Sequence, residues 1–188
     1  GAAPKPLATS AELVALPPKQ VGENVNGRLI ASPRPALPHA QTSSGLGVLI
    51  GGPYQYGLGG PGGWIILDEP ELHLGSDVVV PDLAGWRRER MPRVPQRAFC
   101  ELAPDWICEI ISASTAHLDR GEKLTIYLRE RVGHVWLLDP VPGSLEVLRH
   151  TPGGYLIVGV HCAPVQIRAE PCAAVELDLG LLLGEPES

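Results

Sequence analysis

Basic residues are scarce in this chain. Lys and Arg number 15 against 21 Asp and Glu among 188 residues, which gives a formal net charge of -6. This balance argues against a generally basic protein that binds nucleic acid without specificity. It leaves room for a local basic site on an acidic protein.

Long apolar runs are also missing. No stretch approaches the roughly 18 uninterrupted apolar residues that a helix needs to cross a bilayer. The first residues, "GAAPKPLATS", lack the apolar segment of a signal peptide. We therefore expect a cytoplasmic protein with no membrane partner.

Two common ligand-binding motifs are absent. The four cysteines include no C-x-x-C pair, and Cys108 lies inside an apolar segment, so we expect reduced structural thiols instead of a zinc site or disulfides. The segment 57–63, "GLGGPGG", lacks the strand–turn–helix context of a nucleotide-binding loop. We interpret it as a flexible connection.

The length and composition predict one globular domain over residues 1–188, with the Pro- and Ala-rich residues 1–8 disordered. Strand-like and helix-like segments alternate along it, which is typical of an α/β arrangement with a mixed sheet. We expect strands after the Asn-Gly turn at 26–27, in "GWIILDE", "ELHL", "DVVVPDLAGW" and "DWICEIIS", and in a meander from 134 to 160. We expect helices at 9–16, 38–49 and 119–131, and a last strand or short helix in "VELDLGLLLG".

A single carboxylate interrupts the most apolar of these strands. In "DWICEIIS", both alternating faces are apolar except at Glu109. An ionised carboxylate removed from water costs several kcal/mol unless it is paired, hydrogen-bonded or bound to a cation. Asp82 presents the same anomaly after three valines and a proline. If the two strands are neighbours, a shared divalent cation such as Mg²⁺ or Mn²⁺ would compensate both charges.

Simpler interpretations of these residues stay open. Asp82 can cap a turn after Pro81, and Glu109 can pair with an arginine or accept backbone N–H groups. Lys123, which borders the apolar face of the helix predicted at 119–131, can form an ordinary surface ion pair with Asp119, its i-4 neighbour.

One loop concentrates positive charge. The segment 86–97, "WRRERMPRVPQR", contains five arginines and one acid, and its prolines predict a loop. The loop is either a solvated surface or a contact for nucleic-acid phosphates. The candidates for DNA binding are Arg87, Arg88, Arg90, Arg93 and Arg97.

The segment 104–140, "PDWICEIISASTAHLDRGEKLTIYLRERVGHVWLLDP", resembles the signature of the Uma-type restriction endonucleases, in the PD-(D/E)xK nuclease superfamily. The likeness extends more weakly over most of the chain, including "TSAELVALP", "GENVNGRLIASP" and "VVVPDLAGW". The resemblance implies a restriction-endonuclease-like mixed β-sheet flanked by helices, with additional antiparallel hairpins. It also implies a divalent metal ion and hydrolysis of phosphodiester bonds in DNA.

The resemblance assigns roles to particular residues. Asp82 matches the motif aspartate and Glu109 the second acid, while Ile111 stands where the standard motif has lysine. Lys123, on the following helix, is similar to the family's displaced lysine, and a long flexible side chain can bring its charge to the scissile phosphate from there. Asp82, Glu109 and the backbone carbonyl of Ile110 would hold Mg²⁺ or Mn²⁺.

Glu23 and His39 match a glutamate and a histidine of the family and are possible accessory residues. Two other functions remain open: a catalytically inactive nuclease fold that binds nucleic acid or protein, and a hydrolase of small phosphorylated molecules. For the endonuclease we expect DNA as the partner and a homodimer, because cutting both strands of a duplex favours two symmetry-related sites.

Overall fold

A computed structural model describes residues 20–33 and 36–183 of the chain. The helix predicted at 9–16 and the disorder predicted for residues 1–8 lie outside the described residues.

The larger sheet has six strands in the order β11-β10-β9-β8-β6-β3. They are β3 (Trp64–Asp68), β6 (Leu83–Arg87), β8 (Trp106–Ile110), β9 (His134–Asp139), β10 (Ser144–Thr151) and β11 (Gly154–Cys162). Strands β8 and β9 are parallel and the other pairs antiparallel, so the sheet is mixed, as predicted.

A smaller sheet has the order β2-β1-β5-β4-β7. Its strands are β1 (Gln20–Val25), β2 (Arg28–Pro33), β4 (Glu71–Leu74), β5 (Asp77–Val79) and β7 (Phe99–Cys100). Strands β1 and β2 form the hairpin expected from the Asn-Gly pair: Asn26 and Gly27 have φ of 51° and 74°, the positive values that a tight two-residue hairpin turn needs. Strands β12 (Gln166–Ile167) and β13 (Leu177–Asp178) pair separately.

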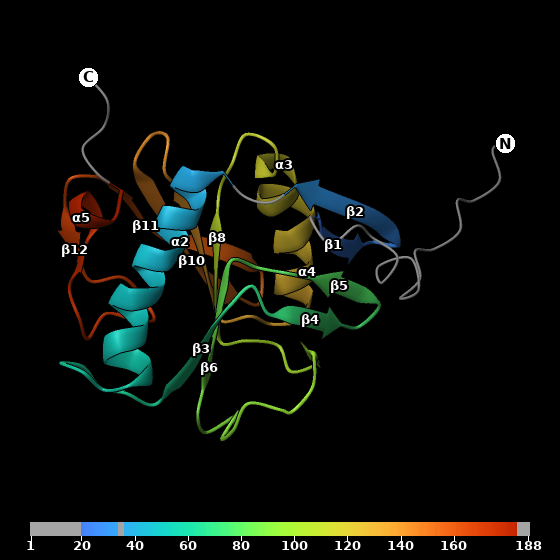
Figure 1. The fold of residues 1–188 in the computed structure, drawn as a ribbon, viewed down its shortest axis with the longest axis horizontal. Helices are drawn as coiled ribbons and strands as arrows, with labels where there is room; N and C mark the ends of the chain where they lie inside the picture. The colour runs from blue at the N-terminus through green and yellow to red at the C-terminus, as the bar shows by residue number, and fades with distance from the viewer. Residues whose placement is uncertain (1–19, 34–35, 184–188) are drawn as a thin grey trace, which may run out of the picture.

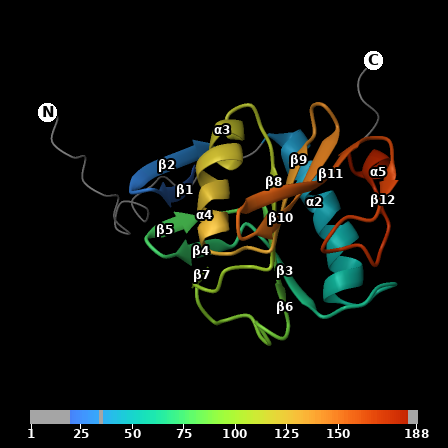
Figure 2. The ribbon, with the colours of Figure 1, turned by 180° about the vertical axis from the view of Figure 1, so that it is seen from behind.

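Helices lie on both sides of the larger sheet (Figures 1 and 2). One side carries α2 (Leu37–Ile50), which continues into a π-helical turn at Gly51–Gln55, and α5 (Leu179–Leu183). The other side carries the smaller sheet and a helix built from α3 (Ala116–Leu118), a π-helical turn η2 (Asp119–Lys123) and α4 (Leu124–Arg129). The mixed sheet flanked by helices, with additional antiparallel hairpins, is confirmed as the sequence predicted.

Strand β8 contributes to the apolar core on each of these sides. Cys108 and Ile110 pack into the cluster that contains residues of α2, whereas Ile107, and Ile111 just after the strand, pack into the cluster that contains residues of α4. All five residues of β8 are buried, as its sequence predicted. Alternation along the strand therefore directs Glu109 toward α4.

Two predicted element boundaries are wrong. The segment 77–86, expected as one strand, breaks into β5 and β6, which belong to different sheets; Val80, Pro81 and Asp82 lie between them. Pro81 has no N–H to donate to a sheet, which favours the break there. The helix expected at 119–131 begins at Ala116 and ends at Arg129.

Within the described residues, no helix is long and apolar enough to cross a membrane.

Candidate active site

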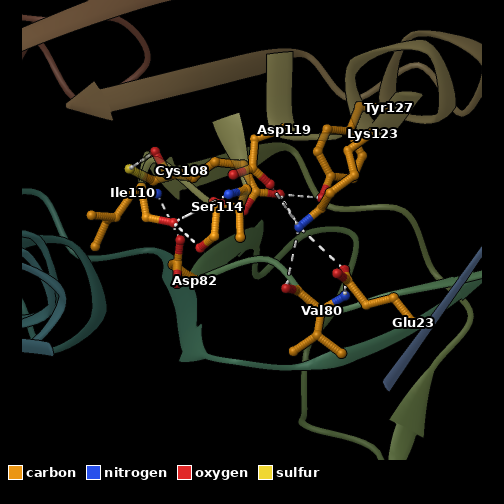
Figure 3. A network of polar contacts seen from close by, with 12 residues as sticks. Glu23, Val80, Asp82, Cys108, Ile110, Ser114, Asp119, Lys123 and Tyr127 are labelled. Carbon is orange, nitrogen blue, oxygen red and sulfur yellow. Dashed lines mark hydrogen bonds and ion pairs between the residues drawn. The ribbon is translucent and has the colours of Figure 1, made fainter. Parts of the chain in front are cut away.

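Glu109 is the buried carboxylate at the centre of the site. Only 1% of the residue is exposed, and its Oε1 accepts hydrogen bonds from the Tyr127 hydroxyl at 2.5 Å and from Lys123 Nζ at 2.8 Å. Figure 3 shows Lys123 directed toward Glu23 and Val80. Both donors to Oε1 come from the helix on the α4 side. The charge that looked anomalous in the sequence is therefore compensated across the interface between this helix and the sheet.

Asp82 lies at the point where the chain crosses from the smaller to the larger sheet. Its Oδ2 accepts a hydrogen bond of 2.6 Å from the Ile110 N–H, and its Oδ1 lies 3.1 Å from His39 Nε2. Because Leu83 pairs with Cys108 in the antiparallel β6–β8 ladder, Asp82 and Glu109 lie at the same end of two neighbouring strands. This is the strand adjacency that the sequence argument assumed.

Lys123 is enclosed by acidic groups. Its Nζ lies 3.2 Å from Glu23 Oε1, 2.8 Å from Glu109 Oε1 and 3.4 Å from Asp119 Oδ1, and only 3% of its side chain is exposed. Glu23 is held in place by the Val80 N–H, which donates to Oε1 at 2.8 Å. The surface ion pair with Asp119 that the sequence allowed is one part of a buried network.

The charges of this network shift the pKa values of its members. Burial alone would lower the pKa of Lys123, but the surrounding negative groups, Glu109 first, hold it well above its ordinary value. Burial raises the pKa of Glu109 well above its usual range, and the Lys123 charge offsets this only in part. The hydrogen bond with Asp82 raises the pKa of His39 against the opposing effect of burial. The surrounding carboxylates therefore favour the protonated form of Lys123.

These side chains line one cavity of about 260 Å³. The α2 side supplies His39, the smaller sheet supplies Glu23, and the helix of Lys123 closes the third side. The acidic residues that line the cavity are Glu23, Glu69, Asp82, Glu109 and Asp119. All the catalytic, metal and accessory residues predicted from the sequence therefore line one cavity.

The predicted DNA-binding arginines lie elsewhere. Strand β6 begins beside Asp82 and ends at Arg87, and the arginine loop follows at the opposite end of the sheet, at the bottom of Figure 1. Five strand residues separate the two ends by about 17 Å. All five arginines are exposed; Arg90 pairs with Asp105, and Arg97 pairs with Glu101. The loop cannot contact the same phosphate as the cavity residues.

The sequence did not identify every residue of the cavity. Asp119 was considered only as a surface partner of Lys123, and Tyr127 only as part of an apolar stripe, yet both contact the buried network. Glu69 lines the cavity with an unusual φ of 43°. The i, i+4 spacing of Asp119, Lys123 and Tyr127 was a usable signal, since it places all three on one helix face.

The cavity offers oxygen donors of the kind that hard divalent cations prefer. Among the described residues, no three His, Cys, Asp or Glu side chains form a group that could hold a metal. Mg²⁺, however, is often bound through only one or two carboxylates and keeps several waters. Asp82 and Glu109 supply two carboxylates at one cavity, which Ile110 also lines.

Comparison with known proteins identifies the family. The family model described as "Uma2: Putative restriction endonuclease" matches residues 10–181. The chain belongs to this family. The match confirms the resemblance predicted from the segment 104–140. Among curated proteins, no relative matches the chain.

The Uma2 assignment agrees with a solved structure. A crystal structure titled as a putative nuclease belonging to DUF820, from Anabaena variabilis, is similar with a TM-score of 0.71 and 21% sequence identity. The similarity covers 92% of this chain and 96% of that one. At this identity the likeness establishes only the fold of the Uma2 chain. Its chemistry has to be argued from the residues of the cavity.

Proposed function

We propose that this Uma2 protein is a metal-dependent endonuclease that hydrolyses phosphodiester bonds in DNA. Family membership supports a nuclease role. The observation that carries the proposal is the meeting of Asp82, Glu109 and Lys123, from three separate segments, in one acidic cavity.

In this proposal Asp82, Glu109 and the carbonyl of Ile110 hold Mg²⁺ or Mn²⁺. A cation bound there would polarise a phosphate oxygen and lower the pKa of the water that attacks phosphorus. Asp82 is already oriented by the Ile110 N–H and by His39.

Lys123 supplies a fixed positive charge in this proposal. Its raised pKa keeps the ammonium protonated, and its buried position removes most of the solvent that would screen the charge. The ammonium group would stabilise the negative charge that develops on the phosphate or orient the attacking water. Glu23 Oε1, 3.2 Å from Nζ, also restrains the ammonium group.

DNA would extend beyond the cavity. The loop with Arg87, Arg88, Arg90, Arg93 and Arg97 would hold phosphates of the backbone about 17 Å away along the duplex, a contact that does not read sequence. A second copy of the chain would supply the site for the opposite strand.

A second function is favoured by one observation. Tyr127 and Lys123 both bind Glu109 Oε1, so the buried carboxylate is compensated without a metal. An arrangement of this kind is what a catalytically inactive nuclease fold that binds nucleic acid or protein would retain.

A cleavage assay separates the two functions. Plasmid and oligonucleotide DNA are incubated with Mg²⁺ or Mn²⁺ and with the wild type, Asp82→Asn or Glu109→Gln. We expect cleavage by the wild type only with metal, and its loss in both variants because each removes an anionic ligand. Cleavage that persists in both variants rejects the assigned site. DNA binding without cleavage in the wild type supports the inactive fold.

A further inference from the structure

The helix that carries Lys123 presents a line of polar groups to the sheet. Asp119 and Lys123 bound the π-helical turn, and Tyr127 follows four positions later in α4. All three are at most 3% exposed. A helix normally packs apolar side chains on its buried face, so the burial of three polar groups there needs a specific reason.

Tyr127 is the member of this line that contacts Glu109 through a neutral donor. Its O–H donates to Oε1 at 2.5 Å, and the Lys123 ammonium donates to the same oxygen at 2.8 Å. Both donors use Oε1, and no residue in the described part of the chain forms a hydrogen bond or ion pair with Oε2, which leaves that oxygen for a further partner.

A contact of this kind determines where the carboxylate points. Strand β8 fixes the Glu109 backbone, but three rotatable bonds separate the backbone from the carboxylate oxygens. A rigid phenol held in the helix–sheet interface restrains the far end of that side chain, and Tyr127 itself is fully buried. Partners that orient a metal-ligating group commonly change metal affinity by about 10- to 100-fold.

We propose that Tyr127 is a positioning residue of the candidate metal site, which holds Glu109 Oε1 so that Oε2 is presented to a divalent cation. The inference rests on the proposed function, because it takes Glu109 as a ligand. Tyr127 touches neither the cation nor DNA and acts only through Glu109. Lys123 places a positive charge next to Glu109 Oε1, whereas Tyr127 fixes the orientation of the carboxylate.

Binding of Mn²⁺ alone tests this role without any need for cleavage. Mn²⁺ is titrated into the full chain, and the free ion is followed by electron paramagnetic resonance. We expect Tyr127→Phe to weaken binding about 10- to 100-fold. Tyr155→Phe is the matched control: the Tyr155 hydroxyl donates to the Val132 carbonyl at 2.8 Å, and Tyr155 does not line the cavity. We expect the control to bind as the wild type does.

Thermal unfolding distinguishes positioning from a structural role. A positioning role reduces the rise in Tm that Mn²⁺ produces, since that rise follows the affinity of the folded state. A structural role lowers Tm equally with and without Mn²⁺.

Equal Mn²⁺ affinity in Tyr127→Phe and the wild type overturns the proposal, and so does a variant that fails to fold. A wild type that binds no Mn²⁺ overturns the metal site of the proposed function itself, and with it the role of Tyr127.

Discussion

Charged residues in the cavity affect the free energy of unfolding strongly because they are buried next to one another. Lys123 Nζ lies within 3.4 Å of carboxylate oxygens from Glu23, Glu109 and Asp119, and all four residues are at most 5% exposed. Removing one partner from a buried ion pair leaves an uncompensated charge, which typically costs about 3 to 5 kcal/mol. An exposed ion pair contributes about 1 kcal/mol or less.

Lys123→Met is therefore expected to lower the free energy of unfolding by about 3 to 5 kcal/mol in EDTA. The loss should be larger at about pH 8 than at about pH 5.5, because acid lets the buried carboxyls, whose pKa values burial has already raised, take up protons. Mg²⁺ or Mn²⁺ should recover part of the loss by replacing the missing charge. Urea unfolding measures each quantity.

Arg97→Met provides the comparison, since Arg97 pairs with Glu101 and 60% of its side chain is exposed. We expect a change below about 1 kcal/mol with no response to metal. A Lys123→Met protein as stable as this control would contradict the view that the ammonium group compensates the buried acids.

At the scale of elements, the π-helical turn sets how the helix meets the sheet. Five residues, Asp119–Lys123, form the turn between α3 and α4, and both of its terminal side chains reach the cavity. Turns of this kind occur frequently at functional sites. At its middle residue, Gly121, a Cβ would meet no described atom within 4 Å apart from the adjoining residues and the backbone of its own helix. The glycine is therefore not required by packing.

Gly121→Ala is expected to stabilise the protein by about 0.4 to 1 kcal/mol, because alanine reduces the freedom of the unfolded chain at a helical position. Metal binding should not change, since the added methyl group points into open space. Gly75→Ala is the opposite control: Gly75 has φ of +64°, which alanine rarely adopts, so this variant should lose stability. Thermal unfolding of both variants checks the pair, and a destabilised Gly121→Ala would show that the turn depends on glycine.

Over the whole molecule, charge is separated along the larger sheet. Acidic groups line the cavity at one end of β6 and β8, and the arginine loop lies at the other end. Contacts between arginine and phosphate release bound counterions, so DNA affinity should fall steeply with salt. A duplex that reaches from the cavity to the loop would use both ends of the sheet.

Replacing the exposed Arg88 and Arg93 by Gln is expected to weaken DNA binding and reduce the slope of log K against log salt by about 2. Mn²⁺ affinity should stay unchanged, because the loop is remote from the cavity. Fluorescence anisotropy over a salt series measures the slope, with Arg168→Gln, an exposed arginine outside the loop, as control. An unchanged slope would remove the loop from the DNA-binding surface.

Local patterns in the sequence predicted much of the fold and part of the site. Glu109 was identifiable because a charge in a strand apolar on both faces needs compensation wherever the strand lies. The burial of Lys123 was not, because an i-4 acid explains a surface lysine equally well. Tyr127 was assigned to an apolar stripe because its ring is apolar. The polar contact of its hydroxyl with Glu109 is visible only in the structure.

By itself, the sequence determined the alternation of strands and helices, the mixed sheet, the family and the two carboxylates, because each depends on spacing between near neighbours. Only the tertiary structure decided that β5 and β6 enter different sheets and that His39, Glu23 and Lys123 approach the two acids from three directions. It also decided that the arginine loop lies at the far end. These are contacts between segments distant in sequence, and they follow from how the layers pack together, which no local pattern records.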